Sequence, residues 1–389
     1  MIPRILAKKI KQLARKFPAI AITGPRQSGK TVLVQNLFPK KPYVLFEDPD
    51  IREFATNDPR GFLQKYPNGA IFDEAQRVPE LFSYLQGIID KKSKAGMFIL
   101  TGSQQFLLLE KITQTLAGRI AIVNLLPFSL EEIKSTPFEP KSLEDILFKG
   151  MYPRLYDKKL KPLDLYPQYV QTYIERDVRS IKNIGDLTTF QKFIKLCAGR
   201  TGQLLNLSSL ANDCGITHNT AKSWISILEA SFIVYLLCPH HANFNKRLIK
   251  SPKLYFYDTG LVCYLLGIEN KKQIETHPLR GNIFETFIMS ELIKFRFNLG
   301  LRSNFYFWQD KTGNEIDCIY DKSGSLIPIE IKSTKTIASN LFKNLHYWNK
   351  ISKSKTKSFL IYGGDDKRIQ HSTYVVGWRE VFSINKMLA

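Results

Sequence analysis

The stretch "GPRQSGKT", residues 24–31, decides the fold of this chain. It follows a short apolar run, "AIAIT" at 19–23, and leads into "TVLVQNLF", whose apolar residues recur at helical spacing. A strand, a glycine-rich loop and a helix form the setting that the pattern GxxxxGK[ST] requires. In that setting, backbone N–H groups of the loop and of the helix N-terminus face phosphate oxygens. The sequence therefore predicts an α/β domain that holds a nucleoside triphosphate.

The residues of this loop have separate predicted roles. Lys30 would reach the β- and γ-phosphates, and Thr31 would ligate Mg²⁺. The expected nucleotide-binding residues are Gly24, Pro25, Arg26, Gln27, Ser28, Gly29, Lys30, Thr31 and, further along the chain, Asp73. The sequence contains no NKxD-type element for guanine recognition. ATP, with Mg²⁺ as its ion, is therefore favoured over GTP.

A second acidic element supports the nucleotide site. The segment "GAIFDEAQRVPEL" at 69–81 is an apolar strand that ends in Asp73 and Glu74, which has the form of a Walker B segment. Asp73 would hold the Mg²⁺ shell, and Glu74 would polarise the attacking water as general base. An acid pair after an apolar run indicates a nucleotide site here because it lies downstream of the phosphate loop.

Two further positions are candidates for catalysis. "MFILTGSQQ" at 97–105 is an apolar strand whose end carries Thr101 and Ser103, which could sense the γ-phosphate or hold the water. The alternative is a glycine-containing turn. Arg119, in "TLAGRIAIVN", could act as an arginine finger in cis or in trans, and a surface salt bridge is the alternative.

The middle of the chain has the pattern of a winged helix. "SLANDCG" and "THNTAKSWISILEAS" predict two helices, the second capped by Thr217, and two apolar runs separated by a basic turn predict a hairpin. The residues expected to contact nucleic acid are His218, Asn219 and Lys222 on the second helix and Lys246, Arg247 and Lys250 in the wing. The alternative is a lid or a packing module.

The C-terminal part carries acids and a lysine in a suggestive order. "GNIFETFIMSELIKFRF" at 281–297 predicts an amphipathic helix with Glu285, and two alternating strands follow around a turn at 322–325. Asp317 on the first strand, with Glu330 and Lys332 on the second, resembles the PD-(D/E)xK nuclease core. Glu285, Asp317 and Glu330 would bind Mg²⁺, and Lys332 would activate water. The alternative is a surface ion pair.

Composition sets the broad class of protein. The chain has 389 residues and a formal net charge of +21, and the positive excess is spread over all thirds of the sequence. This balance indicates a polyanionic partner, with DNA favoured, although a basic protein without such a partner is the alternative. Five scattered cysteines without a CxxC pair fit a reducing cytoplasm. No apolar run is long enough to span a membrane, so no membrane partner is expected.

Taken together, these motifs resemble a known family. The segments "GPRQSGKT", "FDEAQRVPEL", "LTGS", "LAGR" with "LLPFSLEE", "GMYPRLY", "YIERDV", "GNIFE", "GNEID" and "IEIK" occur in the order found in bacterial and archaeal AAA-type P-loop ATPases that carry a C-terminal domain of unknown function (number 4143). The resemblance spans most of the chain. It implies an AAA-type ATPase architecture more firmly than any biological role.

The expected protein has three parts in an α/β fold. They are a P-loop AAA-type ATPase domain at 1–150, a helical linker with a winged-helix region at 151–275, and a restriction-endonuclease-like domain at 276–389. The expected function is ATP hydrolysis coupled to action on nucleic acid. The alternative is an ATP-dependent regulator whose nuclease-like domain only binds a partner. A homo-oligomer or a partner protein is compatible with either.

Overall fold

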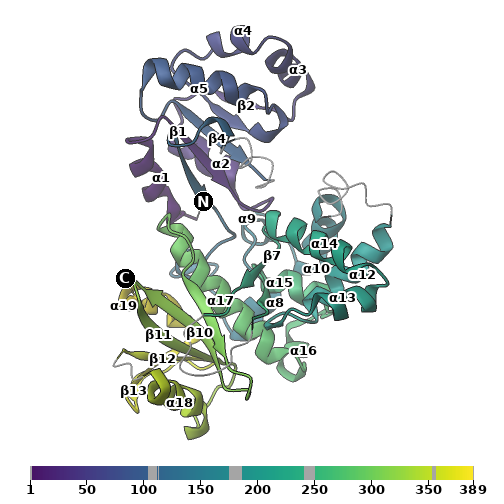
Figure 1. Ribbon diagram of the computed structural model, residues 1–389, viewed down its shortest axis with the longest axis vertical. Helices are drawn as coiled ribbons and strands as arrows, with labels where there is room; N and C mark the ends of the chain where they lie inside the picture. Colours follow the sequence, from purple (N-terminus) through teal and green to yellow (C-terminus); the bar gives the residue numbers. More distant parts are fainter. Residues whose placement is uncertain are drawn as a thin grey trace. The chain divides into compact units, whose positions relative to one another are not determined.

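The computed structural model describes residues 2–103, 112, 114–174, 186–240, 250–352 and 356–388. The chain forms two compact units (Figure 1). The first comprises 1–128 with the short segments 230–232 and 296–301, and the second comprises 129–229, 233–295 and 302–389. The middle and C-terminal regions expected from the sequence therefore share one unit.

The first unit is built on a parallel sheet in the order β2-β3-β4-β1-β5. Its strands are β1 (Ala19–Thr23), β2 (Tyr43–Leu45), β3 (Ile71–Asp73), β4 (Phe98–Gly102) and β5 (Ile120–Asn124). Its helices are α1 (Leu6–Ala14), α2 (Lys30–Leu37), α3 (Pro49–Asn57), α4 (Pro59–Gln64) and α5 (Leu81–Lys92), with the short 3-10 turn η1 (Ala75–Arg77). The predicted order of strand, loop and helix around residues 24–31 is confirmed.

Helices pack on both faces of this sheet, and successive residues of each strand contribute to opposite faces. Ile20 and Ile22 of β1 pack with α1 and α2 in one core cluster. Ala19 and Ala21 belong to a second cluster, which includes residues of α3, α4 and α5. Since parallel strands end at one edge, the loops after β1, β3 and β4 meet there.

The second unit begins with a largely helical region. Its helices are α7 (Leu130–Ile133), α8 (Leu143–Lys149), α9 (Arg154–Asp157), α10 (Pro162–Tyr169), the π-helical turn η2 (Val170–Ile174), α12 (Leu187–Ala198), α13 (Leu207–Cys214), α14 (His218–Ala230), α15 (Thr259–Leu265) and α16 (Lys271–Thr276). A small antiparallel sheet, in the order β6-β8-β7, joins β6 (Gln203–Leu204), β7 (Val234–Leu237) and β8 (Lys253–Phe256). The winged helix stays a prediction, supported by two helices followed by this hairpin.

The rest of the second unit surrounds a mixed sheet in the order β13-β14-β12-β11-β10-β9. The elements are α17 (Arg280–Asn298), β9 (Phe305–Gln309), β10 (Glu315–Lys322), β11 (Ser325–Lys332), η3 (Ser339–Phe342), α18 (Lys343–Ser352), β12 (Ser358–Tyr362), β13 (Lys367–Gln370), β14 (Thr373–Gly377), η4 (Trp378–Glu380) and α19 (Val381–Leu388). The hairpin turn between β10 and β11 lies where the sequence predicts it, with Lys322 paired to Ser325.

One helix prediction is wrong in an informative way. α17 is not amphipathic: apolar residues such as Phe284 and Ile288 are buried, and so are its polar residues Glu291 and Lys294. Those two side chains pair with each other at 2.8 Å, three residues apart. The charged positions that suggested an exposed face are therefore satisfied inside the protein.

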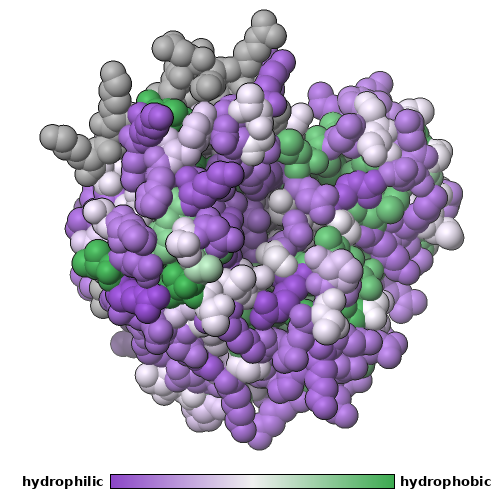
Figure 2. All heavy atoms as spheres, turned by 90° about the horizontal axis from the view of Figure 1, so that it is seen from below, coloured by the Kyte–Doolittle hydropathy of each residue, from purple (hydrophilic) through white to green (hydrophobic). Residues whose placement is uncertain are grey.

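Figure 2 shows one face of the molecule, on which hydrophilic residues dominate and hydrophobic residues form separate patches. Within the described ranges, no helix combines the length and the apolar character that crossing a membrane demands.

Candidate functional site

The phosphate loop requires glycine at its first position. Gly24 has a φ of 147°, and a Cβ added there would lie 2.1 Å from the carbonyl oxygen of Leu125. Gly29, the residue before α2, has a φ of 91°, in the left-handed region that favours glycine. The loop thus turns back over the end of β1 by a path that larger residues would obstruct.

This loop has the properties of an anion site. The first turn of α2 has no side-chain cap on its N–H groups. The buried Oγ of Ser28 and Oε1 of Gln27 have no hydrogen-bond partner. The Nζ of Lys30 donates to the carbonyl oxygens of Gly24 at 2.9 Å and Pro25 at 2.8 Å, which holds the ammonium group against the loop. These features suit a group with several negatively charged oxygens.

Asp73 lies at the centre of a set of polar contacts beside this loop. Its Oδ2 accepts hydrogen bonds from the hydroxyl of Thr31 at 2.6 Å and from the hydroxyl of Tyr43 at 2.7 Å. Its Oδ1 accepts from the hydroxyl of Thr101 and from the backbone N–H of Glu74 at 3.1 Å. Thr31 and Asp73, the two predicted Mg²⁺ ligands, are therefore adjacent, and their hard oxygens fit that ion.

Glu74 has different partners from Asp73. Its backbone is left-handed, with a φ of 55°, so its side chain leaves the line of β3. Its Oε2 accepts hydrogen bonds from the amide of Gln76 at 2.5 Å and from the hydroxyl of Ser103 at 2.9 Å. The structure thus divides the two candidate hydroxyls between the acids: Thr101 contacts Asp73, and Ser103 contacts Glu74.

Arg119 lies away from these residues. Its carbonyl accepts from the N–H of Ala19, at the start of β1, whereas the phosphate loop follows Thr23 at the other end. Strand rise puts roughly 13 Å between these two ends. The guanidinium pairs with Asp90 through two hydrogen bonds of 2.5 and 3.0 Å. Action in cis on a nucleotide at this loop is therefore excluded by position, and the predicted salt-bridge alternative is what the structure contains.

Three contacts at this site were not predicted. Tyr43 reaches Asp73 from the edge strand β2, and burial, followed by the hydrogen bond to Asp73, raises the pKa of its hydroxyl. Gln76 supports Glu74 from the next turn. Arg4 donates to the carbonyls of Ser28 at 2.8 Å and Leu126 at 2.6 Å, which braces the loop from the N-terminal segment. Only Gln76 is near its partner in sequence, so it is the one contact that local sequence could indicate.

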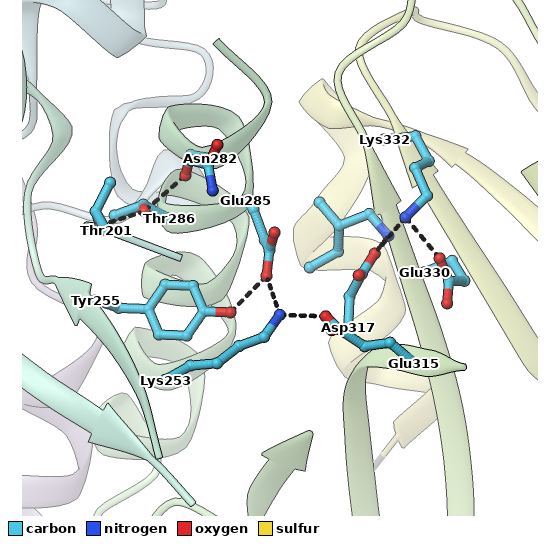
Figure 3. Close-up of polar contacts among 11 residues, drawn as sticks. Thr201, Lys253, Tyr255, Asn282, Glu285, Thr286, Glu315, Asp317, Glu330 and Lys332 are labelled. Carbon is cyan, nitrogen blue, oxygen red and sulfur yellow. Dashed lines mark hydrogen bonds and ion pairs between the residues drawn. The ribbon is translucent and has the colours of Figure 1, made fainter. Parts of the chain in front are cut away.

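A second group of charged residues lies in the other unit (Figure 3). The Nζ of Lys332 is 2.8 Å from Asp317 Oδ2 and 2.7 Å from Glu330 Oε2. The same oxygen of Asp317 accepts the backbone N–H of Ile331 at 2.8 Å. The structure therefore brings Asp317, Glu330 and Lys332 together across the hairpin of β10 and β11.

Glu285 joins this group from α17 by way of a lysine that was not predicted. Lys253, on β8, lies 3.2 Å from Glu285 Oε1 and also pairs with Glu315. The hydroxyl of Tyr255 donates to the same oxygen of Glu285. Figure 3 shows the ammonium of Lys253 between Glu285 and Glu315, whereas the carboxylate of Asp317 points to Lys332.

Burial is the largest single influence on the pKa of each of these acids. It raises the pKa of Glu285 to about 7, against the opposing charge of Lys253. It also raises the pKa of Glu330 well above its usual range, with the charge of Asp317 acting in the same direction. For Asp317 burial acts upward too, but the charges of Lys332 and Lys253 outweigh it and hold the pKa below its usual value.

Comparison with known proteins identifies the parts of the chain. Residues 16–134 match the family described as "AAA domain". The chain carries an AAA domain. Residues 280–381 match a domain of unknown function (DUF4143), and residues 140–272 match another (DUF8612). The AAA domain contains the phosphate loop, Asp73 and Glu74, and the DUF4143 domain contains the four carboxylates around Lys253 and Lys332.

Two relatives align with most of the chain. Uncharacterized proteins of Mycobacterium bovis and Mycobacterium tuberculosis are each 29% identical over 336 residues, which cover 86% of this chain and 74% of theirs. Among solved structures, a Walker-type ATPase of Pyrococcus abyssi is 14% identical and covers 67% of this chain and 94% of its own, with a TM-score of 0.45. RuvB of Thermotoga maritima is 15% identical and covers 59% and 88%, with a TM-score of 0.30.

The predicted metal cluster in the DUF4143 domain is not assembled. Within the part of the chain that the structure describes, no group of three or more His, Cys, Asp or Glu side chains is arranged to hold a metal ion. The physical reason is visible in Figure 3: ammonium groups of Lys253 and Lys332 lie among the carboxylates. Glu285, Asp317 and Glu330 are near one another but do not fit a shared ion in this arrangement.

The residues predicted to contact nucleic acid are only partly described. Thr217 caps α14 by accepting the backbone N–H of Thr220 at 3.1 Å, as expected. His218, Asn219 and Lys222 are exposed on the first turns of α14. Lys250 is exposed just before β8, whereas Lys246 and Arg247 lie outside the described residues. Contact with nucleic acid by this region stays a prediction.

Proposed function

We propose that the AAA domain binds ATP with Mg²⁺ and hydrolyses it. The observation that carries this proposal is that the two neighbouring acids, Asp73 and Glu74, contact different residues at the ends of β3 and β4. Asp73 is held by Thr31, Tyr43 and Thr101 next to the phosphate loop, while Glu74 turns away toward Ser103. These different contacts support a role in a metal shell for Asp73 and a role in activating water for Glu74.

The residues act in sequence as follows. Backbone N–H groups of the loop bind the phosphates, and the Lys30 ammonium exchanges its loop carbonyls for β- and γ-phosphate oxygens. Thr31 and Asp73 would hold Mg²⁺, which neutralises charge on the phosphate oxygens. Glu74 accepts the proton of the attacking water, and Ser103 keeps its carboxylate oriented.

The purified protein tests the proposal directly. We expect release of inorganic phosphate from ATP in the presence of Mg²⁺, none in EDTA, and slower turnover of GTP, because the sequence lacks an NKxD element. Phosphate release and nucleotide binding should be measured together. Absence of ATP binding at millimolar nucleotide would contradict the proposal.

We further propose that this cycle serves an action on nucleic acid through the middle region. The net charge of +21 and the exposed polar residues His218, Asn219 and Lys222 at the start of α14 support it. Two helices followed by a hairpin are the arrangement of a winged helix, in which the second helix enters the major groove.

Binding to duplex DNA should depend steeply on salt. If the protein neutralises 6–10 phosphates, affinity falls by about 10³–10⁵ between 50 and 200 mM salt, because each contact releases counterions. Lys222→Ala should reduce the slope by about one unit. Lys192→Ala, which removes an exposed lysine from α12, is the matched control. Fluorescence anisotropy at several salt concentrations measures both, and no retention of DNA at low salt would contradict this part.

A second candidate function is an ATP-dependent regulator whose DUF4143 domain binds a partner without cutting. The pairing of all four carboxylates with lysines favours it, since a cutting site needs a bound cation. Incubation with plasmid and single-stranded DNA in Mg²⁺ or Mn²⁺ separates the two candidates. Cleavage that Asp317→Ala abolishes would support a nuclease and reject the regulator.

A further inference from the structure

The charged group in the DUF4143 domain is organised as two bridges. Lys332 spans Asp317 and Glu330, with N···O distances of 2.8 and 2.7 Å. Lys253 spans Glu285, at 3.2 Å, and Glu315. Each of the four carboxylates therefore already has an ammonium group as its neighbour.

Lys253 is unlike a surface lysine. Its side chain is only 5% exposed, and it rises from the middle strand of the sheet β6-β8-β7, which belongs to the DUF8612 match. Its ammonium also lies 5.6 Å from the centre of the Phe307 ring. A side chain held by a central strand, two carboxylates and a ring is ordered before any ligand arrives.

Glu330 supplies an independent sign that the group is built for a cation. It is fully buried, its Oε2 is paired with the ammonium of Lys332 at 2.7 Å, and its Oε1 has no hydrogen-bond partner. Buried carboxylates are normally fully hydrogen-bonded or bound to a metal. A buried carboxylate that is only partly satisfied, beside three further acids, indicates a cation site whose present occupants are lysines.

We propose that Lys253 is a built-in cation that closes this carboxylate group to divalent metal ions. The ammonium group lies between Glu285 and Glu315, so a metal bound by these acids would meet a positive charge at close range (Figure 3). Mg²⁺ also requires oxygen ligands at about 2.0–2.1 Å in near-octahedral geometry, which the paired carboxylates do not offer. The proposal rests on the regulator, the second candidate function, and assigns the exclusion of metal to a specific residue.

The two family matches meet in this charge group. Lys253 belongs to the DUF8612 match, and the acids belong to the DUF4143 match. The middle region of the chain thus supplies the cation that contacts Glu285 and Glu315 of the DUF4143 match.

Mn²⁺ alone, without nucleotide, is the probe that tests this. Full-length protein carrying Asp73→Asn, to remove the metal ligand of the AAA domain, serves as the background. Mn²⁺ binding, by isothermal titration calorimetry, and the shift in melting temperature should be measured for three proteins. They are the background protein itself, with Lys253 unchanged, and its Lys253→Met and Lys253→Arg variants. Lys367→Met is the matched control, because Lys367 is exposed on the edge strand β13.

The expected result is a gain of one Mn²⁺ site in Lys253→Met only. At a concentration about 100-fold above Kd, that site should raise the melting temperature by a few degrees, and adding Asp317→Asn should remove it. The background protein, Lys253→Arg and Lys367→Met should show no saturable binding.

Two results would overturn the inference. One is saturable Mn²⁺ binding in the background protein that Asp317→Asn abolishes, and the other is a folded Lys253→Met protein that gains no site. If Lys253→Met does not fold, Mn²⁺ titration of the background protein and of Lys253→Arg still tests whether a lysine-containing group binds the metal. Because metal binding is read without nucleotide or DNA, this result is separate from ATP hydrolysis and from cleavage.

Discussion

Replacing Glu74 by glutamine should lower kcat for ATP hydrolysis by about 10²–10⁴-fold and leave ATP affinity nearly unchanged. Glutamine keeps the size of the side chain and can still contact Ser103, but it cannot accept the proton of the attacking water. Binding should survive because the phosphate loop, Lys30 and the contact between Thr31 and Asp73 are separate from Glu74. The variant should therefore accumulate with ATP bound.

Single-turnover hydrolysis and equilibrium binding of a fluorescent ATP analogue distinguish the two effects. Glu53→Gln makes the same change on the exposed face of α3 and should behave like the wild-type protein. Ser103→Ala should give a smaller loss than Glu74→Gln, because it only frees a carboxylate that is still present. Wild-type turnover in Glu74→Gln would remove Glu74 from the mechanism and place the general base elsewhere.

The parts of this site that the sequence predicts are those in which the chain is locally ordered. The loop at 24–31 lies between a strand and a helix that directly adjoin it, so its position follows from the pattern alone. The same holds for the turn between β10 and β11, since the alternation on each strand fixes which residues face each other. Asp317, Glu330 and Lys332 therefore converge as expected.

Contacts between segments that are far apart in the chain could not be predicted from the sequence. Tyr43 reaches Asp73 only because β2 lies beside β3, and Lys253 reaches Glu285 only because β8 packs near α17. Neither residue belongs to a motif, so a single sequence offers no signal for it. Lys253 matters most, because it pairs with Glu285, which the sequence predicts as a metal ligand.

Two outcomes have the same origin. The sequence predicts an amphipathic helix for α17, whereas Glu291 and Lys294 form a buried pair and Glu291 also accepts the N–H of Leu130 at 2.6 Å. For Arg119 the sequence leaves an arginine finger and a surface salt bridge open, because it does not show at which end of the sheet this residue lies. In both cases the partner of a charged residue decides its role, and that partner is set by packing.

Asp258→Ala should cause a large loss of stability in the second unit. Asp258 is buried at the start of α15, where its carboxylate accepts the N–H of Leu261 at 3.0 Å, the N–H of Met151 at 2.6 Å and the hydroxyl of Tyr166 at 2.7 Å. Alanine leaves the buried N–H groups of Met151 and Leu261 without this acceptor, and the hydroxyl of Tyr166 keeps only the carbonyl of Lys149, at 2.9 Å. At about 1–3 kcal/mol for each unsatisfied group, and allowing for relaxation, the loss should be about 3–5 kcal/mol.

The surroundings of Asp258 leave little room for a substitute acceptor. Gly150 has a φ of 72°, and a Cβ added there would lie 2.2 Å from the hydroxyl of Tyr166 and 2.5 Å from Asp258. The side chains of Tyr152 and Tyr156 are also fully buried nearby, and each contributes to the same packed region. The segment "GMYPRLY" thus has a structural role, since its first glycine lets the carboxylate and the tyrosine hydroxyl approach the backbone.

Thermal unfolding followed by circular dichroism measures this prediction, with Asp186→Ala as the matched control. Asp186 also caps a helix, accepting the N–H of Thr189 at 2.9 Å, but it is exposed. Its loss should cost about 1 kcal/mol, the usual value for a helix N-cap. Asp258→Ala should therefore lower the melting temperature of the second unit several times more than Asp186→Ala does. Equal shifts would mean that the contacts with Met151 and Tyr166 add nothing to an ordinary cap.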